Sequence, residues 1–518
     1  MSLEQKGRGC WSEDPIVTLP PDQTTARTRS AAGNINDNPN AEPPMFRETF
    51  AQRLPLQLSL GAWLVLIIAV VSSAVVLAWP EPEVEGLTVW TFARNHAEMY
   101  EPLAEAHNRA NPDAKLNVFL LDGQALQRRM LSGFMSDTPV ADLIEVEQNM
   151  IGRVFSGPLE DVGFVDLTER LHAPTPDGPS IYEQINEPSF SPWTTRGRIF
   201  GIPHDVHPVV LIYRHDILVE ELGHDMSAIE TWDQFAETLR SAQDIDGDGL
   251  ADRYLLNLWY TSPDMHELLL MQAGGGFFDG DDQLAIDTER NAFVMAKMIT
   301  WMIGPDRIAV DAADFSAPGN ELRLSGRVLC GLTPDWLIGL YRNDLPQLAG
   351  KWRAMPLPAW EPGGRRTSVW GGTSLGITRQ TQDVEAAWEA AKLLYLNDET
   401  ARKLFTDSMI ISPVKSLWGA PFYHEPIDYF GGQAVGSLFI ELAPDVPLRS
   451  STPFRNLARD EWGNAMSKLF RYAEANDAFT VDALLPEARV LLGEAQAEVA
   501  KQMNRNVFVR DADGGEGE

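Results

Sequence analysis

The chain contains three short motifs whose residue types and spacing could carry chemistry. The first, Gly372-Thr373-Ser374-Leu375-Gly376, matches the G-x-S-x-G nucleophile elbow of serine hydrolases. That elbow needs a helix immediately after the serine, whereas the residues from Leu375 to Thr378 read as a strand. The motif therefore does not favour an esterase. A glycoside hydrolase stays open as an alternative, because two suitably placed carboxylates are all that its chemistry requires.

The second motif is an acidic loop that starts at Asp244 and has the spacing of a calcium site. Carboxylates stand at alternate positions and Gly249 is the sixth residue, as a calcium loop requires. The twelfth position is Leu255 instead of a bidentate glutamate, so a complete set of ligands needs an acid from elsewhere. An Asp/Gly turn between a helix and a strand is the equally favoured alternative. The candidate calcium residues are Asp244, Asp246, Asp248, Leu250 and Asp252.

The third motif, His204-Asp205-Val206-His207, places two imidazoles near each other. The flanking residues Pro203 and Pro208 indicate an extended segment, and no third ligand is nearby in the sequence. A metal is not expected there. Calcium is thus the only cation predicted, and no cofactor is required.

The elements that must position these residues follow an apolar segment, residues 54–80, that contains no charged side chain. Its apolar positions would form a helix of about 36 Å, enough to cross a hydrocarbon core of about 30 Å. Basic residues precede it, and Glu81, Glu83 and Glu85 follow it, which predicts a cytoplasmic amino terminus and an external body. We expect an uncleaved anchor in the cell inner membrane, because the run is long for a signal peptide and lacks a clear cleavage site.

Composition limits the remaining possibilities. The 518 residues carry a net charge of −32, which argues against nucleic acid and against anionic lipid as partners. Residues 1–53 are polar and read as a disordered cytoplasmic tail, and residues 511–518 as a second disordered tail. Between them remain roughly 430 residues after the anchor, which suits two lobes better than one core.

The alternation of strand-like and helix-like patterns in the first part of the body predicts a βαβαβ unit. Strands are expected at residues 87–92, 115–121 and 141–146, with a helix capped by Asn95 and a second amphipathic helix between them. Ligands of such units bind outside the carboxyl ends of the strands. The same alternation later in the chain, including a capping box that begins at Thr231, predicts an α/β fold with two doubly wound lobes.

A series of blocks in the body resembles the extracellular solute-binding proteins of family 1, in their sugar-binding branch. The blocks follow one another in the order of the family, from about Leu87 to Trp418. They include Leu87-Thr88-Val89-Trp90-Thr91-Phe92, Ala141-Asp142-Leu143-Ile144-Glu145-Val146, Phe200-Gly201-Ile202-Pro203-His204-Asp205-Val206, Gly274-Gly275-Gly276-Phe277-Phe278, Pro334-Asp335-Trp336 and Trp370-Gly371-Gly372-Thr373-Ser374.

The resemblance implies a periplasmic-binding-protein-like (type II) fold that captures a sugar for an ABC importer, without chemistry on the ligand. Its partners would be a carbohydrate and the permease subunits, and the chain is expected to be a monomer. A tethered solute sensor is the alternative. The first lobe would comprise residues 87–207 and 357–411, and the second lobe residues 208–356 and 412–510. Hinges would lie near residues 205–209, 356–360 and 411–415, each marked by proline.

Sugar binding needs flat apolar faces against the C–H side of the ring and polar groups for the hydroxyls. By resemblance, Trp336 and Trp370 are the predicted stacking platforms, and Asp335, Asp205 and Glu147 the predicted hydroxyl acceptors. The complete set of candidate ligand residues is Phe92, Arg94, Glu147, Asp205, Trp259, Asp335, Trp336, Trp370, Gly371 and Gly372.

Overall fold

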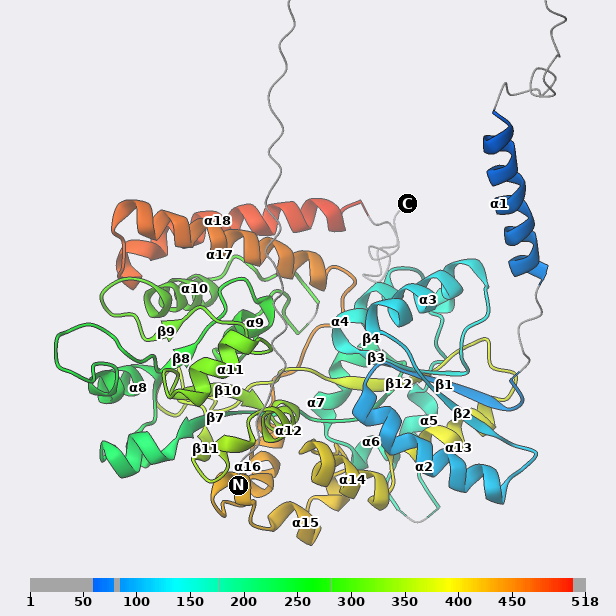
Figure 1. Cartoon of the computed structure of the whole chain (residues 1–518), viewed down its shortest axis with the longest axis horizontal. Coiled ribbons are helices and arrows are strands. Elements are labelled where there is room, and N and C mark those ends of the chain that lie inside the picture. The colour runs from blue at the N-terminus through cyan, green and yellow to red at the C-terminus, as the bar shows by residue number, and fades with distance from the viewer. Residues whose placement is uncertain (1–58, 79–83, 177, 281, 506–518) are drawn as a thin grey trace, which may run out of the picture. The chain divides into compact units, whose positions relative to one another are not determined.

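A computed structural model describes residues 59–78, 84–176, 178–280 and 282–505 (Figure 1). The chain divides into two compact units, Met1–Pro82 and Glu83–Glu518, which we describe separately. The predicted disordered tails, residues 1–53 and 511–518, lie outside the described residues.

The first unit contains one described helix, α1 (Leu60–Ala78), whose sequence has no charged residue. Within the described ranges of the chain, no helix combines the length and the apolar character that a membrane crossing requires. The anchor at residues 54–80 stays a prediction.

The second unit begins with the expected βαβαβ arrangement. Strand β1 (Leu87–Thr91) pairs in parallel with β2 (Leu116–Leu120) on one side and with β3 (Leu143–Glu147) on the other. β12 (Thr373–Ile377) and β6 (Ile202–Pro203) complete a five-stranded sheet in the order β2-β1-β3-β12-β6, with β12 antiparallel to both neighbours.

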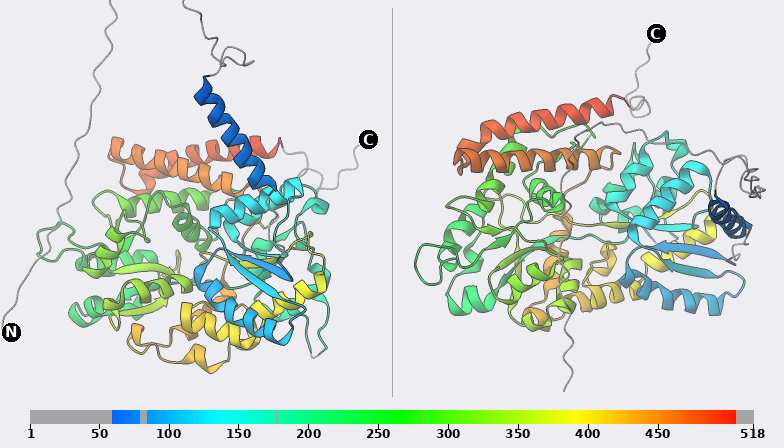
Figure 2. Two further views of the ribbon diagram at one scale, coloured as in Figure 1. Left: turned by 45° about the vertical axis from the view of Figure 1, so that its right-hand side comes forward. Right: turned by 45° about the horizontal axis from the view of Figure 1, so that its top comes forward.

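Helices cover both faces of this sheet (Figure 2). Successive side chains of a strand point to opposite faces, so each face presents its own apolar residues for a helix to cover. Leu143 and Leu375 face a core that includes residues of α2 (Arg94–Ala110) and α13 (Val384–Tyr395). Ile144 and Val146 face a separate core with α3 (Gly123–Ser136) and α4 (Gln148–Ile151). We use "first lobe" for this sheet and the helices that cover it.

The second lobe is built around a three-stranded sheet, β10-β7-β11, which is antiparallel throughout. The prediction of a second doubly wound sheet is therefore wrong in this part. β7 (Val209–Arg214) brings the chain into the lobe and β11 (Trp352–Pro356) leads it back, so the two adjacent strands must run in opposite directions. β8 (Leu256–Asn257) and β9 (Ala309–Val310) add a short parallel pair, as the α/β alternation predicts.

One large apolar cluster fills the second lobe and includes residues of α8 (Trp232–Leu239), α9 (Pro263–Gln272), α10 (Glu289–Met302) and α12 (Asp335–Asp344). The last two helices, α17 (Arg455–Asn476) and α18 (Val481–Met503), pack side by side against α10 (Figures 1 and 2). The packing positions predicted for the last helix, from Leu484 to Val499, are buried there.

The chain passes between the lobes three times. It leaves β6 in the first sheet and enters β7 in the second. On the way back, Leu357 and Val369 still pack in the second core, and β12 starts at Thr373. Around the third passage the chain contacts both lobes, because Ile410 and Val414 belong to a core of the first lobe and Ile411 to that of the second. The exact lobe boundaries given above stay a prediction.

The sequence predicted N-terminal caps for two helices, at Thr231 and at Asn95, and the structure shows where each helix begins. The capping box at Thr231 is confirmed, because the Thr231 side chain accepts from the Gln234 N–H and the Gln234 side chain returns the contact. The cap at Asn95 is wrong, since α2 begins earlier, with Ala93 as its N-cap. The Asn95 amide instead donates to the Ser408 hydroxyl at 3.1 Å, so a contact with α14 takes the place of the local cap.

The bounds of the remaining elements are α5 (Thr168–His172), α6 (Ile181–Gln184), α7 (Glu187–Phe190), β4 (Thr194–Thr195), β5 (Arg198–Ile199), α8 (Trp232–Leu239), α9 (Pro263–Gln272), α10 (Glu289–Met302), α11 (Ala317–Leu324), β10 (Cys330–Pro334), α12 (Asp335–Asp344), α14 (Asp398–Ser408), α15 (Pro421–His424) and α16 (Val435–Leu442).

Candidate ligand-binding site between the two lobes

The site is organised around a buried acid–histidine–acid chain at the passages between the lobes. Nε2 of His207 lies 3.1 Å from Asp205 Oδ2, and its Nδ1 lies 2.6 Å from Asp335 Oδ1. All three residues are at most 4 % exposed. Asp335 is the first residue of α12, while Asp205 and His207 lie between β6 and β7, so the chain of contacts connects the two lobes.

The opposite charges of His207 and the two carboxylates stabilise one another in their ionised forms. Burial alone would lower the pKa of His207, but the two carboxylates outweigh it and raise that pKa to about 10. Burial would raise the pKa of Asp205, and the neighbouring His207 and His204 hold it well below its usual range. His207 is therefore an imidazolium between two carboxylates at neutral pH.

The same carboxylates also accept hydrogen bonds from the backbone. Asp205 Oδ1 accepts from the Thr373 N–H at 3.2 Å, and Asp335 accepts from the Trp336 and Ile411 N–H groups at 2.7 and 2.8 Å. In this arrangement the oxygens of both acids are occupied by the protein. The geometry favours a structural role for Asp205 and Asp335, and their predicted role as hydroxyl acceptors stays a prediction.

The glycine pair Gly371-Gly372 admits other parts of the protein at close range. Both residues have positive φ, +98° and +136°. A Cβ on Gly371 would lie 2.9 Å from the indole nitrogen of Trp336, and one on Gly372 would lie 2.7 Å from a guanidinium nitrogen of Arg449. The pair is therefore needed because an indole and a guanidinium pack directly on this stretch of backbone.

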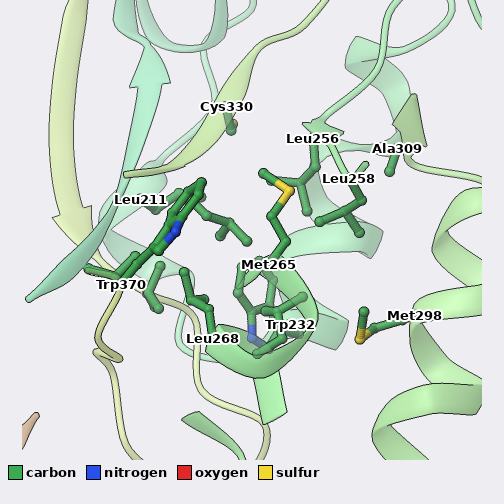
Figure 3. Packing of buried hydrophobic residues seen from close by; sticks show 14 of the residues in the cluster. Leu211, Trp232, Leu256, Leu258, Met265, Leu268, Met298, Ala309, Cys330 and Trp370 are labelled. Atoms are coloured by element: carbon green, nitrogen blue, oxygen red, sulfur yellow. The ribbon is translucent and has the colours of Figure 1, made fainter. Parts of the chain in front are cut away.

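The two predicted stacking platforms differ in their surroundings. The Trp336 indole is partly buried and donates to the Trp370 carbonyl at 2.8 Å. Trp370 is only 8 % exposed and packs with Leu211, Leu268 and Met265 in the core of the second lobe (Figure 3). Trp370 thus contributes mainly to packing, and Trp336 is the better placed of the two to meet a ligand.

An aromatic residue that sequence reasoning missed extends this surface. Phe315 stacks on Trp336 with ring centroids 5.8 Å apart and planes 14° from parallel, and it is 58 % exposed. The preceding residue, Asp314, is buried and fixed by Asn257 at 2.8 Å and by the guanidinium of Arg323. The signal in the sequence was weak, because an isolated phenylalanine after an acidic residue does not mark a binding surface.

A charged cluster connects the first lobe to α9 and α17. The side-chain oxygen of Asn149, in α4, accepts from Arg455 at 2.9 Å and from Arg459 at 2.8 Å. Arg455 also donates to both oxygens of Glu267 at 2.7 Å, and Arg459 pairs with Asp264. These contacts bring the lobes together at the carboxyl end of β3. The sequence analysis predicted none of these residues, and only the neighbouring Glu147 was among its candidates.

Glu147 itself caps α4 by accepting from the Asn149 N–H at 2.9 Å. Burial raises the pKa of Glu147 to about 7, and that hydrogen bond only partly opposes the shift. It therefore titrates near neutrality beside the charged cluster.

Three other candidates lie at strand ends without a described contact to this cluster. Phe92 follows β1, is partly buried, and makes an edge contact with His96 at 6.3 Å. Arg94 is exposed at the start of α2, and Trp259 follows β8 and is 38 % exposed. Among the described residues, no hydrogen bond, ion pair or ring contact joins these side chains to Trp336 or to Arg449.

The motifs considered for chemistry have clear local structures. Ser374 lies inside β12, and its hydroxyl donates to the Ile202 carbonyl at 2.8 Å, so it is not on a strand-to-helix turn. In the acidic loop, carboxylate oxygens of Asp244, Asp246 and Asp252 lie within 4.8 Å of one another. Asp248 is not part of that group, and its carboxylate accepts from the Leu250 N–H.

A cavity of about 810 Å³ lies between the lobes, large enough for a small saccharide, and neither Trp336 nor Phe315 is among its lining residues. Its walls come from the first lobe (Phe190, Ser191), from the glycine run after α9, and from residues 447–451, which include Arg449.

Comparison with known proteins agrees with this architecture. The family model of the bacterial extracellular solute-binding proteins matches residues 93–401. Among curated proteins, the arabinooligosaccharide-binding protein of Halalkalibacterium halodurans is 26 % identical over 381 residues, covering 70 % of this chain and 79 % of that protein. The lactose-binding protein of Rhizobium radiobacter is 23 % identical, covering 71 % and 85 %.

Among solved structures, the sugar-binding protein MalE of Xanthomonas citri superposes with a TM-score of 0.65 at 15 % identity, covering 81 % of this chain and 99 % of that one. This confirms the predicted periplasmic-binding-protein-like fold of the body. The chain belongs to the family of bacterial extracellular solute-binding proteins.

The acid–histidine–acid chain predicts a pH-dependent stability. We expect His207→Gln to lower the free energy of unfolding by about 3 kcal/mol at pH 6, because it leaves two buried carboxylates without their cation. The pKa of His207 is raised, so its contribution is complete below about pH 6.5 and is lost as the pH rises towards about 10. Thermal unfolding from pH 6 to 10 should therefore show the gap between wild type and variant shrinking. A gap that stays constant, or an equal effect of the exposed-residue variant His172→Gln, would contradict this role.

The acidic loop generates a second prediction. If the three clustered carboxylates hold calcium, about 1 mM CaCl₂ should raise the melting temperature of the chelator-treated body, as expected for weak extracellular sites. Asp244→Asn should abolish the rise, and magnesium should not reproduce it. Calorimetry that detects no heat, together with an unchanged melting temperature, would remove calcium from this loop.

Proposed function

We propose that this chain is a membrane-tethered solute-binding protein that captures a sugar or oligosaccharide and delivers it unaltered to an ABC-type importer. The observation that carries the proposal is the stacked pair Phe315 and Trp336, an exposed flat apolar face, at the passages between the lobes. A flat aromatic face matches the C–H side of a sugar ring. The curated relatives named above bind arabinooligosaccharides and lactose, which supports the same ligand class here.

The arrangement of the lobes supports capture by closure. Ligand groups that contact both Asn149 in the first lobe and Trp336 in the second would favour the closed state over the open one. Closure then follows as a population shift that needs no chemical step. The burial of Ser374 inside β12 supports a binding role over hydrolysis.

Sugar binding is testable by thermal shift of the body against arabino-oligosaccharides, β-galactosides and maltodextrins. We expect one of these classes to raise the melting temperature. Phe315→Ala and Trp336→Ala should each weaken the affinity about tenfold, or about 1.4 kcal/mol, through the loss of stacking area. The matched control is Phe293→Ala, an exposed aromatic on α10 that lies outside the site. Equal affinity in all three variants would contradict a stacking role, and no response to any saccharide would contradict the proposed function.

Tethering is a separate part of the proposal and rests on the uncharged residues 54–80, with basic residues before them and Glu81, Glu83 and Glu85 after them. A tether would raise the local concentration of the binding body beside its permease. We expect the full chain to stay with the membrane fraction after an alkaline wash, and a chain that begins at Val84 to be released. Release of the full chain would contradict the anchor.

A further inference from the structure

Residues 447–454, which we call the strap, belong to the second lobe and lie against the first. The strap follows Val446, whose side chain is in the core of the second lobe, and ends just before Arg455, the first residue of α17. It contains neither helix nor strand. Its middle is nevertheless buried, since Ser451 is 3 % and Thr452 5 % exposed. A buried irregular segment must find partners for its polar groups elsewhere in the protein.

Two partners of the strap come from the first lobe. The Arg449 N–H donates to the Ser191 hydroxyl at 3.1 Å. The Ser451 hydroxyl donates to the Thr194 carbonyl. Ser191 and Thr194 flank Trp193, which is buried in a core of the first lobe. The strap is therefore fixed to a well-packed part of that lobe.

Two further hydrogen bonds join the lobes just outside the strap. The Asn186 side chain, which follows the first-lobe core residue Ile185, donates to the Ala443 carbonyl at 3.2 Å. The Asn456 side chain donates to the Asn149 carbonyl at 2.9 Å. The contacts between the lobes thus extend along the chain on both sides of the strap.

The closest approach of the strap to the first lobe is at Gly152, the residue directly after α4. A Cβ on Gly152 would lie only 2.8 Å from the Thr452 carbonyl oxygen, closer than such atoms pack in proteins. The φ angle of Gly152 is −52°, which any residue adopts. Glycine is therefore needed here because the strap backbone packs directly on it, and not because of the backbone conformation.

The second lobe holds the strap as well. The Ser450 hydroxyl donates to Asp282 Oδ1 at 2.5 Å. Arg455, directly after the strap, donates to both carboxylate oxygens of Glu267 at 2.7 Å. All of these partners belong to the chain itself. The two lobes are therefore joined through the strap without any contribution from a ligand.

The strap also borders the space between the lobes. Residues 447–451 form part of the wall of the cavity of about 810 Å³, together with Phe190 and Ser191 of the first lobe. The hydrogen bond between the strap and Ser191 lies at that wall. Parting the strap from the first lobe would therefore widen the cavity.

From these contacts we infer that the strap is a latch: it holds the two lobes together when no ligand is bound, and it must part from the first lobe before the lobes can separate. The latch acts without a ligand, whereas its consequence for ligand entry rests on the proposed sugar-binding function. A sugar that enters between separated lobes binds only the unlatched fraction of the molecules, so the latch lowers the rate of association.

Gly152→Ala tests the latch, because it forces a methyl group against the strap backbone and removes no polar group. In the ligand-free full chain, we expect the backbone amides of residues 447–454 to exchange hydrogen at least about tenfold faster than in wild type. Ser451→Ala removes one hydrogen bond to the first lobe and should speed the same exchange by less. The amides of β7, in the centre of the second lobe, should exchange as in wild type, which separates local parting from general destabilisation.

The matched control is Gly463→Ala on α17, where an added Cβ meets no neighbouring atom of the described residues within 4 Å. It should exchange like wild type. Unchanged exchange of the strap in both Gly152→Ala and Ser451→Ala would overturn the latch and leave sugar binding untouched. Wild-type strap amides that exchange as fast as those of the exposed acidic loop, residues 244–252, would overturn it too. That wild-type comparison and Ser451→Ala decide even if Gly152→Ala does not fold.

The consequence for entry is measured by stopped-flow binding of the saccharide that responds in the thermal-shift screen. We expect Gly152→Ala to raise the association rate at least about threefold, because more molecules are unlatched, and Gly463→Ala to leave it unchanged. Faster strap exchange without faster association would overturn the role of the latch in entry. If no saccharide binds, the proposed function fails, and the exchange experiment still decides the latch.

Discussion

The pairing of one buried imidazolium with two buried carboxylates is the constraint on which the rest of the structure depends. The Asp205–His207–Asp335 chain touches all three passages between the lobes. Asp205 and His207 belong to the first passage, Asp205 accepts from Thr373 at the second, and Asp335 accepts from Ile411 at the third. Separating these groups would leave charges buried without partners, so they must stay together while the lobes move. A closing motion that keeps these contacts would therefore pivot close to His207.

The three residues of the acid–histidine–acid chain use their polar side-chain atoms on one another and on backbone N–H groups. Farther out, at Asn149, Arg455 and Arg459, the contacts join opposite lobes through side chains that could separate as the lobes open. Arg455 and Arg459 keep their partners Glu267 and Asp264 within the second lobe. A motion that separates Asn149 from these arginines would therefore leave the two ion pairs within the second lobe intact.

Sequence analysis predicted the strands and helix caps that depend on local patterns. It missed contacts between segments that are far apart in the sequence. The strands from β1 to β3, their parallel pairing and the capping box at Thr231 follow from alternation and turn chemistry within about thirty residues. Trp370 was predicted as a stacking platform by resemblance to the family, but the glycines after it admit Trp336 and Arg449 while the Trp370 indole packs inward. Arg449 was missed altogether, since only the folded chain brings it onto Gly371 and Gln148.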